Sequence, residues 1–224
     1  MNHTHDAGHH DHTIMGELTS HLPYAIFSVA VGLIILSFAT FFSFGETAEV
    51  MCTKADILFH SFHFIHIVFA ATGTLITFFR FSHNMAKALI VGVISPAIFC
   101  TLSDSVLPYI DGQILGIKMH FHLCFISELP NVIPFLLVGI LNGFVLSFHK
   151  ERQWVYSVAS HAVHILISSL AAIFYLVSHG CTDWYLIIGP VFLFLIFAVV
   201  VPCTLSDVVV PMLIARAGTK HEKH

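Results

Sequence analysis

The sequence predicts an all-α integral membrane protein with six transmembrane helices, arranged as two inverted three-helix repeats. Three observations lead to this fold class. The chain of 224 residues is 57% hydrophobic and only 10% charged, whereas a soluble domain carries about 25% charged residues. It contains six separate apolar segments. It also repeats the pentapeptide Cys-Thr-Leu-Ser-Asp, at residues 100–104 and 203–207.

The first twenty residues differ from the rest of the chain. Residues 1–20 are polar, lack Lys and Arg, and contain five histidines. A secretory signal peptide begins with basic residues, so this composition argues against one. We expect a cytoplasmic tail. Its histidines either bind Zn, Ni, Co or Cu in a weak, exchangeable way or belong to a polar extension without such a role.

Each of the six apolar segments is long enough to cross a membrane, which takes about 20 helical residues. Only helices and closed barrels satisfy their backbone in lipid, and uniformly apolar runs favour helices. The predicted spans are 23–44, 58–79, 86–109, 129–148, 154–178 and 184–213.

The Lys and Arg residues predict the orientation, because cytoplasmic loops carry an excess of them. Seven lie on one predicted side and two on the other. The seven are Arg80, Lys87, Lys150, Arg152, Arg216, Lys220 and Lys223, and the two are Lys54 and Lys118. Both termini, including a second tail at 216–224, are therefore expected in the cytoplasm, with a bacterial inner membrane as the simplest location. The net charge of −4 and the absence of a basic patch argue against a nucleic-acid partner.

Three landmarks recur in the same order in both halves of the chain. They are Ser-x-Leu-Pro at 20–23 and 127–130, His-x-x-His at 63–66 and 161–164, and the two pentapeptides. A unit of three helices crosses the membrane an odd number of times, so the second unit must be inverted. We therefore predict repeats at 21–116 and 117–215, a plan that is common among secondary transporters.

This topology assigns one group of polar side chains to each leaflet, with the two groups about 10–20 Å apart. The outer cluster is predicted to contain His63, His66, Asp104 and Glu128, with His60 and Cys100 in second rank, and the inner cluster His161, His164, Asp207 and His21, with Cys203 in second rank.

The residue types and spacing of these clusters are typical of metal sites. Histidines three apart lie on one helix face, and two imidazoles with a carboxylate suit divalent transition metals. Pro108 and Pro211 each follow an Asp by four residues. Because proline has no N–H, we expect each Asp to have a freed carbonyl at a kink, available to an ion.

The sequence therefore favours a transporter of divalent transition-metal ions over an enzyme. Zn²⁺ is the favoured ion, Fe, Mn, Co and Ni also fit, and protons are a candidate coupling ion because metal ligands must lose their protons to bind. Three alternatives remain open: a redox protein with His-ligated haem, an intramembrane metallohydrolase, and a membrane protein whose metals are structural. The oligomeric state is not predicted.

Overall fold

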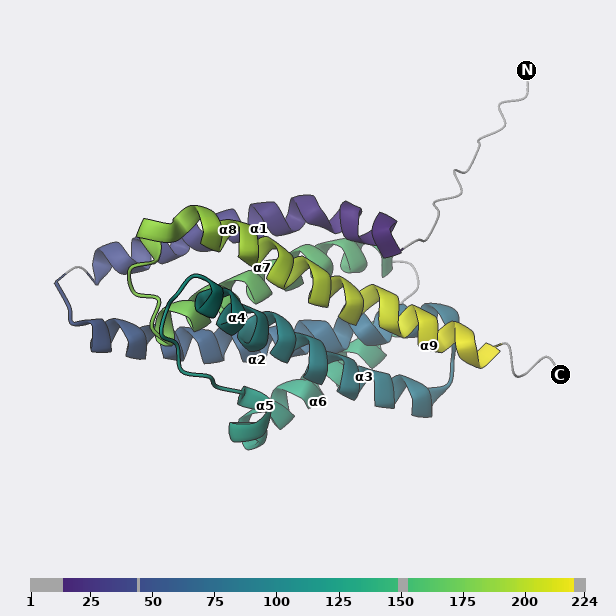
Figure 1. Ribbon diagram of the computed structural model, residues 1–224. Coiled ribbons are helices and arrows are strands. Elements are labelled where there is room, and N and C mark those ends of the chain that lie inside the picture. Colours follow the sequence, from purple (N-terminus) through teal and green to yellow (C-terminus); the bar gives the residue numbers. More distant parts are fainter. Residues whose placement is uncertain (1–13, 44, 149–152, 220–224) are drawn as a thin grey trace, which may run out of the picture.

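The computed structural model describes residues 14–43, 45–148 and 153–219, and all the secondary structure in those residues is helical (Figure 1). Two of the elements, η1 and η4, are π-helical turns, and η3 is a 3-10 turn. In chain order the elements are α1 (Ile14–Phe42), α2 (Ala48–Phe81), α3 (Met85–Thr101), η1 (Leu102–Val106), α4 (Leu107–Ile114), α5 (Cys124–Ser127), α6 (Leu129–Ser147), α7 (Gln153–Ser178), η3 (Trp184–Ile187), α8 (Ile188–Thr204), η4 (Leu205–Val209) and α9 (Val210–Thr219).

Within the described residues, six helical stretches are long and apolar enough to cross a membrane, which confirms the predicted number of spans. Each overlaps one predicted span. They are Leu18–Phe42, Ala48–Phe81, Met85–Ile114, Leu129–Ser147, His161–Ser178 and Trp184–Ala217.

Helix α2 begins well before its predicted span, at Ala48 rather than at residue 58. Thr47 caps it, because its Oγ1 accepts a hydrogen bond of 3.4 Å from the Val50 N–H, a role that Thr favours. Hydropathy misses this first part because it carries Glu49, Lys54 and Asp56. The earlier start puts His66 near the middle of the 34-residue helix.

The ends of the chain are also more helical than predicted. Helix α1 begins at Ile14, inside the expected tail, and continues through Pro23. Neighbouring helices make such a proline tolerable in a membrane. Helix α9 runs on to Thr219, and the start of α1 and the end of α9 lie at the same end of the bundle (Figure 1). The remaining tail residues, 1–13 and 220–224, lie outside the described residues.

Helix α2 makes its most extensive contacts with α7 and α6. Against α7 it runs antiparallel, and Phe62 stacks on Phe174 with ring centroids 5.8 Å apart. Against α6 it approaches closely at Gly139, where an added Cβ would lie 2.7 Å from the Val68 carbonyl oxygen. Small residues allow such backbone approach between membrane helices. Helix α2 is therefore held in the interior with its histidines.

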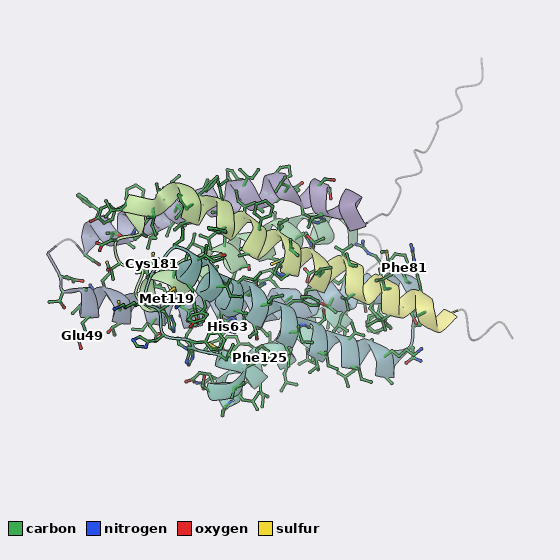
Figure 2. The ribbon with its side chains drawn as sticks, viewed as in Figure 1. Glu49, His63, Phe81, Met119, Phe125 and Cys181 are labelled. Atoms are coloured by element: carbon green, nitrogen blue, oxygen red, sulfur yellow. The ribbon has the colours of Figure 1, made fainter. Side chains whose placement is uncertain are left out.

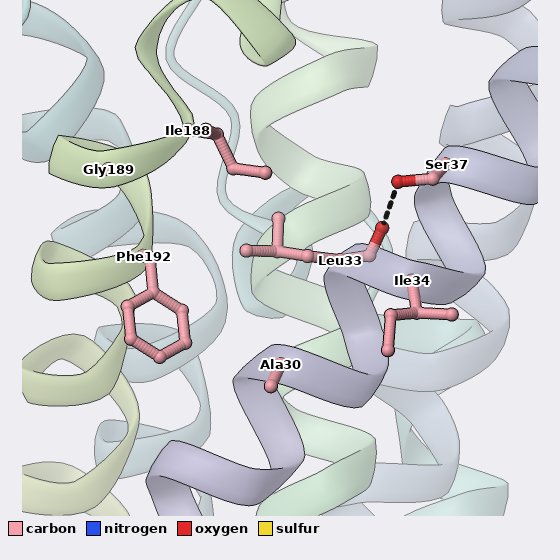
Figure 3. Close-up of a pocket in the computed structure, with 7 residues that line it drawn as sticks. All are labelled: Ala30, Leu33, Ile34, Ser37, Ile188, Gly189 and Phe192. Atoms are coloured by element: carbon pink, nitrogen blue, oxygen red, sulfur yellow. Dashed lines mark hydrogen bonds between the residues drawn. The ribbon is translucent and has the colours of Figure 1, made fainter.

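An apolar groove of about 370 Å³ lies between α1 and the start of α8, lined by Leu33, Ile34 and Phe192 (Figure 3). Its one hydroxyl, on Ser37, donates a 2.7 Å hydrogen bond to the Leu33 carbonyl. None of its lining residues has a metal-ligating side chain. The polar chemistry of the described bundle lies elsewhere, between α2 and α7.

Candidate metal centre

Three histidines lie in the centre of the bundle, His63 and His66 on α2 and His164 on α7. Each is at most 1% exposed. Figure 2 shows His63 inside the bundle, where its ring packs edge-on against Phe125 with centroids 6.4 Å apart. Buried imidazoles need hydrogen-bond partners, and two buried carboxylates provide them.

Asp104, in η1, accepts hydrogen bonds on both carboxylate oxygens and is fully buried. Its Oδ2 accepts from Nδ1 of His63 at 2.8 Å and of His66 at 2.6 Å. Its Oδ1 accepts from the Ser103 hydroxyl at 2.6 Å and from the Ser168 hydroxyl, on α7, at 3.0 Å. Asp104 thus fixes the orientation of two imidazoles on α2.

Asp207, in η4, has the same role for α7 but fewer partners. Its Oδ2 accepts a hydrogen bond of 2.5 Å from His164 Nδ1, while His161 Nδ1 lies 3.6 Å away. Its Oδ1 has no hydrogen-bond partner among the described residues. Gly73 of α2 makes room for this carboxylate, because a Cβ there would lie 2.5 Å from Oδ2.

The two anchored imidazoles meet at their other nitrogens: His66 Nε2 and His164 Nε2 are 2.6 Å apart. An ionised carboxylate only accepts hydrogen bonds, so both Nδ1 atoms carry the proton of a neutral ring. Both Nε2 atoms then direct a lone pair at each other. Such a pair is repulsive unless a proton or a metal cation lies between them, so the arrangement favours a bound positive charge.

Two cysteines flank the imidazole pair, and we call His66, His164, Cys100 and Cys203 the central cluster. Both Sγ atoms lie 3.8 Å from His66 Nε2. The ligand atoms of His66, His164 and Cys203 all lie within 4.8 Å of one another, whereas Cys100 is outside this group although its Sγ lies near His66 Nε2. Two His and two Cys are a tetrahedral zinc ligand set, and a carboxylate behind each imidazole is the usual support of such ligands.

The dimensions of the central cluster are close to those of a bound ion. A tetrahedral zinc ion holds two nitrogen ligands about 3.3 Å apart, and a nitrogen and a sulfur about 3.6 Å apart. The observed separations between nitrogen and sulfur are 3.8 Å, and that between the nitrogens is 2.6 Å. Of these distances, the one between the two nitrogens is too short for a bound ion, so binding requires the two rings to move apart while the carboxylates keep hold of Nδ1.

The predicted separation of about 10–20 Å between two clusters is wrong. His66 and His164 are in contact, so the two groups share one centre. The prediction took residue 58 as the start of the second span, which put His66 in its outer part. Because α2 begins at Ala48, His66 lies at mid-length, where α7 crosses it.

The Asp and Cys side chains lie differently around the imidazoles than their predicted ranks as ligands imply. Asp104 and Asp207 were expected to be direct ligands, but they bind the Nδ1 atoms on the far side of the imidazoles. Cys100 and Cys203 were ranked second, but their sulfurs lie at the imidazole pair. Ser168 and Gly73, which the sequence did not single out, complete the surroundings of the carboxylates.

The predicted freed carbonyl is shifted by one residue. In the π-helical turn η4 the Val210 N–H donates to the carbonyl of Leu205, five residues back. The missing N–H of Pro211 therefore leaves the Ser206 carbonyl, rather than that of Asp207, without its helical donor. Hydroxyls of Thr74 and Ser95 donate to it, each at 3.1 Å. These two bonds make the Ser206 carbonyl a joint between helices.

Other predicted residues lie outside the central cluster. The ring centroid of His21 is 4.3 Å from that of His161, as expected of the inner group. Glu128 was expected beside Asp104, but it lies with His60 in a groove, where its Oε2 accepts a 2.6 Å hydrogen bond from Asn131. The reason is that Glu128 directly precedes α6, so its carboxylate turns to the first turn of that helix.

A second group of ligand-type side chains lies near the start of α2, and we call His60, His122 and Cys124 the mouth cluster. Their ligand atoms also lie within 4.8 Å of one another. Burial lowers the pKa of the His122 imidazole, and neighbouring His60 lowers it further. Burial raises the pKa of the Cys124 thiol to about 12. Cys124 was not singled out from the sequence, because His60 lies far from it in the chain and only folding brings the two side chains together.

No protein-family model matches the chain, and neither the curated proteins nor the solved structures include a significant match to it.

Proposed function

We propose that the protein is a membrane transporter of divalent transition-metal ions, with Zn²⁺ as the favoured ion and the central cluster as its binding site. One observation carries the proposal: two imidazoles, each anchored at Nδ1 by a buried carboxylate, direct their Nε2 atoms at each other between two cysteines. The softness of two thiolates favours Zn over Mn, and Co, Ni and Fe remain compatible with the ligand set.

Buried nitrogens on either side of the central cluster favour movement of the ion over permanent storage. Nε2 of His63 and Nε2 of His161 are buried without a hydrogen-bond partner among the described residues. Each lies three residues from its partner in the central cluster, about 4.5 Å along the helix. Together with His21 beside His161, they form a series of imidazoles through which an ion can pass by short steps.

We propose that the two halves form the inverted repeat. Helices α2 and α7 are antiparallel, and each carries a His-x-x-His pair whose second histidine bonds to the Asp of one pentapeptide. Both pentapeptides contribute to π-helical turns, η1 and η4. Alternating access about such a pseudo-symmetric centre is a common transport mechanism.

The orientation with cytoplasmic termini in a bacterial inner membrane is also a proposal. The start of α1 and the end of α9 lie at one end of the bundle (Figure 1). The guanidinium of Arg216, in α9, lies 4.9 Å from the Phe81 ring centroid, at the end of α2. Arg80 and Lys87 flank the adjacent turn. This concentration of positive charge supports a cytoplasmic location for this end; Lys150, Arg152, Lys220 and Lys223 lie outside the described residues.

The other functions fit the centre less well. A haem requires a macrocycle between its two axial imidazoles, whereas these nitrogens are 2.6 Å apart with Cys100 and Cys203 beside them. A hydrolase needs an open metal position for water and substrate, whereas His66, His164 and Cys203 are each at most 1% exposed. A structural metal remains the main competitor, because the ligands join α2, α3, α7 and α8.

The test is metal flux into proteoliposomes containing the purified full-length protein and an enclosed zinc-sensitive dye. We compare the wild type, the double variant His66→Gln/His164→Gln, and Cys181→Ser, which removes a buried thiol outside both clusters. Flux in the wild type and in Cys181→Ser, and background rates in the double variant, support transport. A wild type that binds zinc at the central cluster but shows no flux would overturn transport and assign the metal a structural role.

Because ligand nitrogens and thiols must be unprotonated to bind a metal, zinc binding to the central cluster displaces any proton on the two Nε2 atoms and on the ligating thiols. Proton coupling is then an exchange of protons for a zinc ion at the central cluster. Calorimetric zinc titration in buffers with different ionisation enthalpies measures the protons released per bound ion. We expect release from the wild type and less from His66→Gln/His164→Gln.

A further inference from the structure

The mouth cluster combines side chains from three parts of the chain. His60 lies on α2, His122 in the segment between α4 and α5, and Cys124 at the first position of α5. The rings of His60 and His122 are 5.6 Å apart. Both imidazoles are half-buried, and the Cys124 side chain is fully buried.

Hydrogen bonds leave one nitrogen of each imidazole available to a metal. His60 Nδ1 donates to the Asp56 carbonyl oxygen at 2.9 Å, which leaves the lone pair on Nε2. The Ser127 hydroxyl donates to the Leu123 carbonyl at 2.9 Å, so it accepts from His122 Nε2 at 3.2 Å. That bond leaves the lone pair on His122 Nδ1. Such outer partners, which fix the tautomer, are typical of metal-ligating histidines.

The segment that carries His122 is fixed to the end of α7. The His122 N–H donates to the Tyr175 hydroxyl at 3.2 Å, and this hydroxyl lies 3.4 Å from the His122 carbonyl oxygen. Met119 is buried in the same apolar cluster as Tyr175 and Cys181 (Figure 2). The segment that carries His122 and Cys124 is therefore held in position by the hydrogen bond to Tyr175 and by packing in the apolar cluster.

An acidic groove leads to the cluster. Its volume is about 360 Å³, and Asp56, His60, Glu128 and Asn131 line it. The Asp56 side chain is 49% exposed and its Oδ2 lies 3.5 Å from His60 Nδ1. Carboxylates at the opening of a cleft attract cations and raise their local concentration. His60 is thus the point at which the groove and the cluster meet.

We propose that His60, His122 and Cys124 form a second metal site, which takes a divalent ion such as Zn²⁺ or Co²⁺ and delivers it to the central cluster. Three protein ligands leave a fourth position open, which suits an ion that must leave again. His63, with its unpartnered Nε2, is one helical turn further along α2 toward His66. The delivery role rests on the proposed transport function, whereas the binding of the ion does not.

The test for binding is a Co²⁺ titration of the full-length protein in detergent, followed by the absorption band of a thiolate bound to cobalt. The background variant Cys100→Ser/Cys203→Ser removes the thiols of the central cluster, and Cys181→Ser in that background is the matched control. We expect a cobalt–thiolate band in the background and in the control, and its loss when Cys124→Ser is added. Absence of the band in the background, or its persistence with Cys124→Ser, would overturn the site.

Two further variants test the site without removing the thiol. His122→Gln removes a ligand and Ser127→Ala removes its outer partner, and we expect each to weaken Co²⁺ binding in the same background about 10-fold or more. Unchanged affinity in both overturns the assignment of His122. These variants are informative even if Cys124→Ser fails to fold.

Zinc flux separates this inference from the proposed function. In an otherwise wild-type protein we expect His122→Gln to raise the zinc concentration needed for half-maximal flux about 10-fold and to leave the maximal flux intact. Zinc bound at the mouth cluster without any wild-type flux refutes transport and leaves the second site standing. Normal flux in His122→Gln at all zinc concentrations refutes the delivery role alone.

Discussion

Asp104 and Asp207 occupy the same position in identical pentapeptides and in π-helical turns of the same length, but their carboxylates have different partners. Asp104 accepts from two imidazoles and two hydroxyls. Asp207 accepts closely from His164 alone, and its Oδ1 has no partner among the described residues. One of the additional donors to Asp104, Ser103, lies in the repeated pentapeptide itself, whereas the other, Ser168, comes from a helix that faces the turn.

The facing helices explain why Asp104, but not Asp207, accepts a hydroxyl from a neighbouring helix. Helix α7 presents the Ser168 hydroxyl to Asp104, whereas α2 presents only the backbone of Gly73 to Asp207. A carboxylate with four donors holds its imidazoles rigidly, and one with spare acceptor capacity can shift or take up a further donor. The Asp104 half thus provides a fixed frame, and we expect the separation of the two Nε2 atoms on metal binding to occur on the Asp207 half.

The largest expected effect that separates the two halves is on stability. Asp104→Ala leaves buried imidazole and hydroxyl donors without an acceptor, and we expect it to lower the free energy of unfolding by about 3–5 kcal/mol. Asp207→Ala removes one close acceptor and should cost about 1–3 kcal/mol. Thermal unfolding of both variants in one detergent, without added metal, measures the difference. Equal losses would mean that the additional hydrogen bonds that Asp104 accepts do not contribute to the free energy of unfolding.

A substitution at Gly73 should affect the Asp207 half alone. A Cβ at this position would lie 2.5 Å from Asp207 Oδ2, so Gly73→Ala displaces the carboxylate from His164. We expect zinc affinity at the central cluster to fall about 10-fold, as measured by competition with a chelating dye. The matched control is Gly189→Ala, since nothing lies within 4 Å of a Cβ there. An equal affinity for the two variants contradicts this role of Asp207.

The sequence predicted the number of spans because apolar length alone decides whether a helix can cross a bilayer. It misplaced His66 in depth because hydropathy cannot follow a helix into the polar residues that Thr47 caps. The identity of the histidines and acids at the centre followed from their repetition in the two halves. The choice of direct ligands did not, because the crossing of the helices decides which nitrogen of an imidazole meets an Asp and which meets a Cys. For the same reason, the sequence did not reveal the roles of Cys124 and Ser168.

Removing the Ser168 hydroxyl should make Asp104 resemble Asp207. Ser168→Ala deletes one donor to Oδ1 while the Ser103 hydroxyl remains at 2.6 Å. We expect a loss of stability of about 1 kcal/mol and little change in zinc affinity, since both imidazole bonds persist. Thermal unfolding and zinc titration of the same preparation check both parts. Ser169→Ala is the control, because this buried hydroxyl donates only within α7, to the Ile165 carbonyl. A large loss of zinc affinity would show that the orientation of Asp104 depends on α7.

The smallest expected effect concerns the joint at Ser206, whose carbonyl accepts from both Thr74 and Ser95. Either hydroxyl satisfies the carbonyl, so Thr74→Val and Ser95→Ala should each cost about 0.5–1 kcal/mol. With both removed the buried carbonyl has lost both side-chain donors, and the cost of the double variant should exceed the sum of the single costs by about 1 kcal/mol. A double-mutant cycle of unfolding free energies measures this coupling. Strict additivity would mean that water reaches the turn, and η4 would then be a mobile, hydrated element rather than a dry joint between α2, α3 and the Asp207 half.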